Sequence, residues 1–460
     1  MKSSAEINLA EAIDGQRISR FQYLVFFLCL LCLMADGFDA QALGYVVPAM
    51  SKQWGVEPGL FKHAFSVGLL GMAIGALALG SLADYVGRRR IILLCALVVG
   101  ISTWLMGAVT SLEQLIALRL CAGLAIGGLI PNTLTLAAEF SPTRNRAAVV
   151  MITACGISTG AALGGLVAGL LIEQHSWPIV FHFGGGLSLG LALLFFFVLP
   201  ESIHFQALKK PNDPRFFRAL SKIFPQRDFP LGTRFVTGET KRKGFTVQHL
   251  FTEGRAVQTL LVWLIYFLCL LEIYFLASWL PTLLSKAGVP LQWSVYSTSA
   301  LQIAGTVAAL TMGPLLERFN PARILMLLFI LAGAALLLIG RAVDNHALLM
   351  FSAALVGFGV VGGQGGMHAI ASRIYPTSMR STGMGWGLGI GRIGSIVGPV
   401  IGGILLTQQW QPKTLLELGA VPPLLAACAA FFLSLTFARR NGRPAPETEQ
   451  RRPAATPEYP

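Results

Sequence analysis

The chain has 460 residues, of which 54% are hydrophobic and 12% are charged, and its formal net charge is +13. A soluble globular domain carries about 25% charged residues, so this composition excludes a soluble enzyme. A basic balance is typical of both nucleic-acid-binding and membrane proteins, and the positions of the charges decide between these two classes.

Twelve mostly apolar segments follow one another along the chain, each long enough to cross the hydrocarbon core of a bilayer as a helix of about 20 residues. They lie near 21–48, 61–82, 91–110, 112–138, 147–173, 178–199, 257–284, 292–316, 324–341, 346–372, 381–407 and 414–437. We therefore predict an all-α membrane protein with five parts. These are an N-terminus (1–20), a six-helix half (21–200), a polar linker (201–256), a second six-helix half (257–438) and a tail (439–460).

The Lys and Arg residues indicate how the chain is oriented. Of the 35, 28 lie in the N-terminus, the linker, the tail and every second loop, five lie in the other loops, and Arg119 and Arg392 lie inside predicted spans. Positive loops mark the cytoplasmic side, so we expect a multi-pass protein of the plasma (inner) membrane with both termini and the linker in the cytoplasm. Charges spread over alternate loops argue against a nucleic-acid-binding patch.

Charged residues inside the first and fourth spans are the first candidates for function, because a charge in the bilayer is costly. Asp36 and Asp39 are three residues apart, which places both carboxylates on one face of a helix. At 1.5 Å per residue, Asp39 and Arg119 lie at similar depths, roughly 14 Å and 10 Å from the same membrane face. We predict that Asp36, Asp39 and Arg119 form a proton-coupling group; the alternative is a static ion pair that holds helices together.

Two loops recur in the second half of the chain. Residues 80–91 (GSLADYVGRRRI) match residues 313–324 (GPLLERFNPARI) at an offset of 233, and residues 142–146 (PTRNR) match residues 376–380 (PTSMR) at an offset of 234. Two matches at nearly one offset predict two six-helix units. An even number of spans in each unit makes the two halves parallel, related by an axis along the membrane normal.

The later spans carry further isolated candidates. Arg392 lies in a glycine-rich stretch about 18 Å into span eleven, and its planar guanidinium matches a carboxylate. We predict that it binds the carboxylate of a ligand; the alternative is pairing with Asp36 or Glu272. Glu139 and Glu272 are further proton-coupling candidates, although a lone Glu is as readily a hydrogen-bonded structural group, and His368 is either a contact for a ligand hydroxyl or a packed, neutral side chain.

The loop motif Gly80-x-x-x-Asp84-x-x-Gly87-Arg88-Arg89 with its degenerate second copy, and Arg119-x-x-x-Gly123, resemble the major facilitator superfamily across the whole chain. Within it, residues 36–48 (DGFDAQALGYVVP) resemble the aromatic acid:proton symporters, which include carriers of 4-hydroxybenzoate, protocatechuate, gentisate and hydroxyphenylpropionate. The resemblance implies that the chain imports a small aromatic carboxylate, such as a hydroxybenzoate, with protons by alternating access. The second loop departs from the pattern, because it has Glu317 where an Asp is usual and lacks the Gly-Arg pair.

Further site residues belong to these predictions. The resemblance implies that the acidic pair is needed for transport and that functional arginines match Arg380 and Arg392. Candidates for contact with the substrate are Arg392, Gln41, Tyr45, His368 and Trp386, although aromatic residues also belong at membrane interfaces. We predict that Asp84 and the arginines after it latch a gate between the halves, the alternative being orientation by charge alone. The gating candidates are Gly80, Asp84, Gly87, Arg88, Arg89, Glu317, Arg318 and Arg380.

Three other functions remain open at this stage. A proton antiporter that exports its substrate has the same fold, but the fifth span lacks the Gly-Pro element typical of such proteins; another organic anion is a second possibility. A membrane chemosensor is the third, since the linker is long enough to dock a partner. We expect no enzyme activity, cofactor or metal, and the expected partners are a small aromatic acid, protons and the lipid bilayer, with the chain acting as a monomer.

Overall fold

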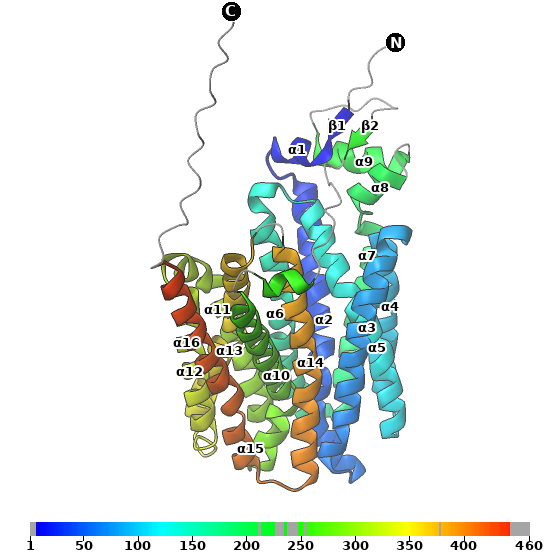
Figure 1. The fold of residues 1–460 in the computed structure, drawn as a ribbon. Helices are drawn as coiled ribbons and strands as arrows, with labels where there is room; N and C mark the ends of the chain where they lie inside the picture. The colour runs from blue at the N-terminus through cyan, green and yellow to red at the C-terminus, as the bar shows by residue number, and fades with distance from the viewer. Residues whose placement is uncertain are drawn as a thin grey trace, which may run out of the picture.

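The computed structural model describes residues 6–209, 213–225, 234–236, 247–252, 255–376 and 379–441. Within these ranges twelve helical segments are long and apolar enough to cross a membrane, which confirms the predicted all-α fold (Figure 1). In the first half they are α2 (Arg20–Trp54), α3 (Lys62–Val86), α4 (Arg88–Met106), α5 (Leu112–Glu139), α6 (Thr143–His175) and α7 (Pro178–Val198). In the second half they are α10 (Ala256–Lys286), α11 (Leu291–Arg318), α12 (Pro321–Ile339), α13 (His346–Ile374), α14 (Arg380–Thr407) and α15 (Pro412–Leu418) with α16 (Val421–Asn441).

The helices of the two halves pack in the same pattern. In the first half α2 packs on α6, α3 on α5 and α4 on α7, and in the second half α10 packs on α14, α11 on α13 and α12 on α16. This is the pairing expected of two copies of one six-helix unit, as the repeated loops predict. The two halves stand side by side with their helices roughly parallel (Figure 1).

The last predicted span is two helices instead of one. α15 ends at Leu418 and α16 begins at Val421, directly before Pro422 and Pro423. Proline lacks the backbone N–H that would continue a preceding helix but fits the first turn of a new one. The break is therefore set by the two prolines, within a segment whose hydropathy is uninterrupted.

The molecule has two opposite ends, the linker face and the far face. The linker face is the end that carries α8 (Ile203–Lys209) and α9 (Pro214–Ile223), and the start of α2 and the end of α16 lie at this same end (Figure 1). The far face carries α15 and the short 3₁₀ helix η1 (Pro58–Phe61).

The N-terminal segment and the linker form a small folded cap on the linker face of the first half, which the sequence did not predict. Strand β1 (Glu6–Asn8) pairs in parallel with β2 (Arg234–Val236), α1 (Leu9–Asp14) follows β1, and η2 (Val247–Phe251) precedes α10. The buried residues that hold the cap together are Leu9, Ile13, Phe216, Leu220, Ile223 and Phe235. The cap therefore has its own apolar core, continuous with the core of the first half.

The two halves meet toward the far face. α6 packs on α11, α2 on α10, and both α3 and η1 on α14. Lys286 pairs with Glu57 across this boundary at 3.0 Å, and the rings of Phe65 and Trp279 lie 5.2 Å apart. Hydrogen bonds and ion pairs between the halves that involve only described residues lie between the middle of the membrane spans and the far face. The far face is therefore the closed end.

Candidate functional site

The acidic pair and the arginine of the fourth span come together as the sequence predicts, but through different atoms. Asp36, Asp39 and Arg119 are all buried. Arg119 Nη1 donates to the backbone carbonyl of Asp39 at 3.2 Å, not to its carboxylate. The carboxylate turns toward α7 instead, where Oδ2 accepts a hydrogen bond of 2.8 Å from Ser188 Oγ. Ser188 is thus a site residue that the sequence analysis missed, because a serine in an apolar span carries no distinctive signal.

Asp36 lies one turn before Asp39 in a different environment. Neither of its carboxylate oxygens has a hydrogen-bond partner among the described residues, although both are buried. A buried, unpartnered carboxylate is costly when ionised. Arg392 interacts electrostatically with Asp36, but among the described residues the two groups form no ion pair.

Arg392 reaches across the boundary between the halves from α14. Its Nη1 lies 3.2 Å from the thioether sulfur of Met72 on α3. A thioether is a weak acceptor, so most of the hydrogen-bonding capacity of the guanidinium is not used by this contact. The side chain is half-buried. Arg392 is therefore placed to contact a group that enters between the halves.

A small cavity of about 70 Å³ lies beside these charges. It is lined from both halves, by Gln41, Met72, Arg119 and Gly123 on one side and by Tyr274, Ala277 and Ser278 on the other. Ligand pockets usually measure about 300–1,000 Å³, so an aromatic acid requires the cavity to widen. Gln41 Nε2 donates to the carbonyl of Ala277 and so joins the halves across this cavity.

Four of the predicted site residues lie apart from this cavity or cannot be placed. Tyr45 is fully buried and its hydroxyl donates to the Ala161 carbonyl of α6 at 2.6 Å. Glu272 is buried and faces Gly419 between α15 and α16, inside the second half, and its carboxylate oxygens have no hydrogen-bond partner in the part of the chain that the structure describes. Trp386 is 45% exposed and stacks on Trp263 with ring centres 6.0 Å apart. The side chain of His368 lies outside the described part of the structure.

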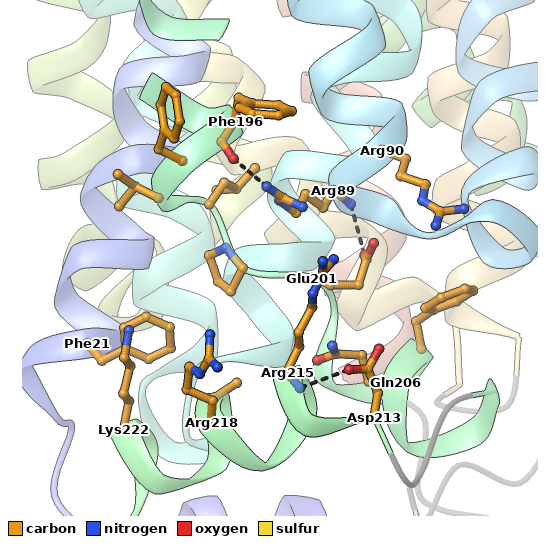
Figure 2. A pocket seen from close by; sticks show the side chains of 16 residues that line it. Phe21, Arg89, Arg90, Phe196, Glu201, Gln206, Asp213, Arg215, Arg218 and Lys222 are labelled. Carbon is orange, nitrogen blue, oxygen red and sulfur yellow. Dashed lines mark hydrogen bonds between the residues drawn. The ribbon is translucent and has the colours of Figure 1, made fainter. Parts of the chain in front are cut away.

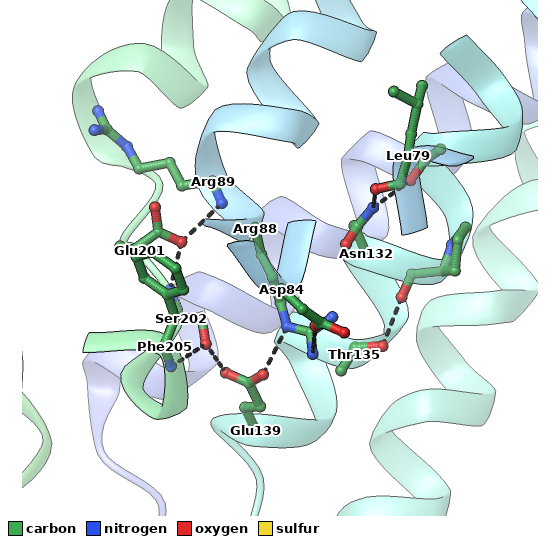
Figure 3. A network of polar contacts seen from close by, with 12 residues as sticks. Leu79, Asp84, Arg88, Arg89, Asn132, Thr135, Glu139, Glu201, Ser202 and Phe205 are labelled. Atoms are coloured by element: carbon green, nitrogen blue, oxygen red, sulfur yellow. Dashed lines mark hydrogen bonds and ion pairs between the residues drawn. The ribbon is translucent and has the colours of Figure 1, made fainter. Parts of the chain in front are cut away.

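The predicted gating loop forms a polar network at the linker face (Figure 3). Arg88 at the start of α4 pairs with Asp84 at 3.2 Å and with Glu139 at the end of α5 at 2.8 Å. The other oxygen of Glu139 accepts a hydrogen bond from the Ser202 hydroxyl. The structure thus places Glu139 with the gating residues and away from the acidic pair with which the sequence analysis grouped it.

Gly87 and Arg89 connect this network to the end of α7. Gly87 has a φ of 108°, and a Cβ built there would lie 2.5 Å from Glu201 Oε2. Only glycine adopts this conformation without strain. The backbone N–H of Arg89 donates to Glu201 Oε1 at 2.9 Å, and its guanidinium donates to the Phe196 carbonyl. The sequence analysis did not identify Glu201 or Ser202 as site residues. Their only distinguishing feature in the sequence is that a carboxylate, Glu201, follows directly after a span.

The second copy of the loop does not repeat this network among the described residues. Arg318 is exposed at the end of α11, Arg380 begins α14, and the Glu317 side chain lies outside the described part. The residue that corresponds to Glu139 at the repeat offset of 234 is Arg373, which donates to the Leu316 carbonyl at 3.3 Å. The charge at this position is reversed.

Gly80 lies in the first copy of the loop and is another of the predicted gating residues. It has room for a Cβ, whose nearest neighbour would be Pro131 at 3.9 Å.

Within the described residues, no group of three or more His, Cys, Asp or Glu side chains could hold a metal ion. The membrane-buried site holds carboxylates, which can exchange protons, and guanidinium groups, which can bind anions.

Comparisons with known proteins agree with the twelve-helix fold. The Major Facilitator Superfamily profile matches residues 29–307 and 262–458. A gallate transporter of Pseudomonas putida is 36% identical over 96% of this chain and 98% of its own length. The 4-hydroxybenzoate transporter PcaK of Acinetobacter baylyi is 35% identical over 92% of this chain and 93% of its own. A 3-(3-hydroxy-phenyl)propionate transporter of Escherichia coli is 29% identical over 88% of this chain and 92% of its own.

A solved structure shares the fold. The crystal structure of a bacterial homologue of the human lysosomal transporter Spinster superposes with a TM-score of 0.70 at 17% sequence identity, covering 93% of this chain and 99% of that one. Identity at this level supports the fold alone, whereas the aromatic acid transporters align over nearly their whole lengths. The chain therefore belongs to the major facilitator superfamily, within the group that contains these aromatic acid transporters, and is a membrane transporter, not an enzyme.

Proposed function

We propose that this transporter imports a small aromatic carboxylate, such as a hydroxybenzoate, together with protons by alternating access. The observation that carries the proposal is the buried pair Asp36 and Asp39 beside Arg119 in the first half, with Arg392 reaching across from the second half, in a chain whose relatives are named for aromatic acids. We place the chain in the inner membrane as a monomer, with the linker face in the cytoplasm. Closure at the far face then corresponds to a state open toward the cytoplasm.

Asp36 and Asp39 are proposed as the proton carriers. An ionised Asp36 without a hydrogen-bond partner is costly in its buried site, and a bound proton removes that cost. The Asp39 carboxylate accepts a hydrogen bond from Ser188, and the Arg119 guanidinium donates to the backbone carbonyl of the same residue instead of to the carboxylate. A small movement of α2 against α5 would bring the guanidinium to the carboxylate, so protonation can be tied to how these helices pack. Glu272 faces the interior of the second half and has a weaker claim to this role.

Arg392 is proposed as the anchor of the substrate carboxylate. Its fork can donate two parallel hydrogen bonds to a carboxylate, and Met72 is a poor competitor for them. Gln41 and Tyr274 line the adjoining cavity and supply a polar and an aromatic contact for a hydroxylated ring. Tyr45 and Trp386 are occupied elsewhere in this conformation, and a role for them requires a different packing of the halves.

The Asp84–Arg88–Glu139 network is proposed as the cytoplasmic gate latch. Three helix ends meet there, and Glu201 links them to α7. Within the described residues the latch binds only elements of the first half, which fits a gate that is open on this side. Arg318 and Arg380 of the second half are the groups proposed to approach it when the cytoplasmic side closes.

Uptake measurements test this function directly. Cells that produce the chain should accumulate labelled hydroxybenzoates from a panel of hydroxylated benzoates and phenylpropanoids, and a protonophore should abolish accumulation. Accumulation that does not respond to the protonophore would contradict symport. A panel in which no aromatic acid is taken up would contradict the substrate class, and proton-driven export of preloaded acid would favour the antiport alternative.

A further inference from the structure

A second, larger pocket lies outside the transport site, on the linker face of the first half (Figure 2). Its volume is about 500 Å³, and it is bounded by the start of α4, the end of α7 and the cap helices α8 and α9. It does not contact the second half. The proposed transport mechanism makes no use of it.

The pocket is lined by an excess of positive charge. Five basic side chains surround it, namely Arg89, Arg90, Arg215, Arg218 and Lys222. The two acidic residues in its wall are already engaged by backbone N–H groups. Glu201 accepts from Arg89 at 2.9 Å and from Ser202 at 2.9 Å, and Asp213 accepts from Arg215 at 2.8 Å as the N-cap of α9. The arginines on α9 therefore have no carboxylate partner among the described residues.

The fold of the cap aims these cations into the pocket. Arg215, Arg218 and Lys222 follow a spacing of three and four residues, so they share one face of α9, and Figure 2 shows them rising from α9 toward the end of α7. The opposite face, with Phe216 and Leu220, is buried in the cap core. Rotating the basic face away would expose that apolar core, so the basic face is fixed by the folding of the cap.

The pocket lies at the end of a membrane span, where the charged headgroups of membrane lipids are expected. α7 is a membrane span, and its last turn forms one wall of the pocket. Phe196 and Phe197 in this turn are 58% and 74% exposed, as expected of side chains that face lipid tails. A basic pocket at the end of a span, beside exposed apolar side chains, matches a molecule with an anionic head and an apolar tail.

We propose that this pocket binds the phosphate headgroup of an anionic phospholipid, with its acyl chains against Phe196 and Phe197. Arg215 and Arg218 donate to the phosphate oxygens by charge-assisted hydrogen bonds, and Arg90 and Lys222 add positive charge at the rim. The lipid bridges α9 of the cap to α4, directly after the Gly87–Arg88 turn. It therefore ties the cap to the gate latch of the first half.

The test is native mass spectrometry on the full-length protein in detergent, with phosphatidylglycerol or phosphatidylcholine added. The pocket variant is Arg215→Ala/Arg218→Ala. The control variant is Arg17→Ala/Arg323→Ala, which removes two exposed basic side chains of the linker face outside this pocket. We expect the unsubstituted protein and the control variant to retain phosphatidylglycerol over phosphatidylcholine. The pocket variant loses both arginine donors and should bind phosphatidylglycerol more weakly by at least about tenfold, which is the change implied by loss of even one charge-assisted hydrogen bond.

Inorganic phosphate in the absence of lipid separates a lipid from a soluble anion. We expect millimolar phosphate neither to displace phosphatidylglycerol nor to raise the unfolding temperature of the protein. If millimolar phosphate raised the unfolding temperature by as much as phosphatidylglycerol does, the pocket would be assigned to a soluble anion and the proposal would be overturned. Equal phosphatidylglycerol binding by the pocket and control variants, both with unchanged unfolding temperatures, would also overturn it.

Discussion

The contacts of Arg392 leave most of its hydrogen-bond donors available to a ligand. Its guanidinium spans the boundary between the halves, yet its described partner there is the sulfur of Met72. A charged group held in the membrane by so weak an acceptor is positioned for a ligand that arrives and leaves. The same residue interacts with Asp36, so an anion bound at Arg392 and a proton bound at Asp36 favour one another electrostatically.

Arg392→Ala should therefore weaken substrate binding more than it changes folding. A charge-assisted hydrogen bond contributes about 1.5–3 kcal/mol, which corresponds to a rise of about tenfold to a hundredfold in the KM for uptake. Arg392→Lys keeps the positive charge but loses the planar guanidinium, so its KM should lie between those of the original chain and of Arg392→Ala. Arg341→Ala, which removes an exposed basic residue in a far-face loop, should keep the original KM. An unchanged KM in Arg392→Ala at normal protein levels would remove Arg392 from the site.

Gly87 is the second residue whose role is set by its surroundings. Gly87→Ala would place a Cβ 2.5 Å from Glu201 Oε2 at a φ of 108°, and such strain costs about 1–3 kcal/mol. We expect a lower unfolding temperature in detergent and slower uptake. Combining it with Glu201→Ala should recover part of the loss, since the clash is relieved while the strained φ persists.

Gly190→Ala is the matched control for this substitution. Gly190 lies within α7, and a Cβ there meets nothing within 4 Å. Alanine at a helix interior is favoured over glycine by about 0.5–1 kcal/mol, so the unfolding temperature should stay the same or rise. Equal effects of Gly87→Ala and Gly190→Ala would show that the backbone conformation of Gly87 is unimportant.

At the scale of elements, hydropathy predicts where the helices lie but not how each one is rotated. Glu272 and Tyr274 are two residues apart in α10, yet one faces α15 and α16 and the other lines the cavity between the halves. A span that is apolar on all sides has no polar face to indicate which side meets a neighbouring helix. For the same reason Ser188 could not be matched to Asp39 from the sequence, whereas the charged Asp36, Asp39 and Arg119 could be singled out by their cost in lipid.

The cap escaped prediction for a different reason. Its parts lie more than 200 residues apart in the sequence, as the pairing of Ile7 with Phe235 shows. The strands β1 and β2 have three residues each, too few to show a clear periodicity. α9 is amphipathic, but its pattern does not indicate which distant segment covers its apolar face, and its basic residues are already explained by the orientation rule. Only the three-dimensional contacts reveal that α1 and α9 share a core with the first half.

Attachment of the cap to the membrane domain should depend on pH through Asp14. Hydrogen bonds from the side chain and backbone N–H of Thr143 lower the pKa of Asp14, with help from Arg146 and Arg144. A lowered pKa means that this contact stabilises docking fully above the unfolded pKa of about 3.9 and is lost as the pH falls through the folded value. Spin labels at Gly15 and Asn145 should therefore separate as the pH falls from about 6 to 3.

Asp14→Asn supplies the comparison for this pH effect. The amide keeps the shape of the side chain but cannot ionise, so it lacks the charge-assisted part of the contact with Thr143. We expect the distribution of distances between the two spin labels to be broader in Asp14→Asn at pH 6 and to change less on acidification. A pH response in Asp14→Asn as large as in the original chain would assign the effect to other groups.

For the whole molecule, closure of the far face depends on the close approach of two glycine-containing segments. A Cβ at Gly403 of α14 would lie 2.8 Å from the Gly59 carbonyl oxygen and 2.4 Å from Lys62 Cβ, in the first half. Backbone atoms of η1 cannot move aside without separating the halves. Gly403→Leu should therefore disfavour the conformation described above and shift the population toward one that is open at the far face.

Gly389→Leu makes the same substitution on the same helix where a Cβ meets nothing within 4 Å, so it isolates the effect of the contact. A cysteine introduced at Ala40, an exposed residue that lines the cavity between the halves, should react with a membrane-impermeant thiol reagent from outside the cell several-fold faster in Gly403→Leu. Uptake should fall sharply in this variant, because a transporter that cannot close its outer side cannot complete the cycle, whereas Gly389→Leu should retain both properties of the original chain. Unchanged labelling and uptake in Gly403→Leu would show that the packing of α14 on η1 does not control closure at the far face. The contacts of α6 with α11 and of α2 with α10 would then have to hold the far face closed.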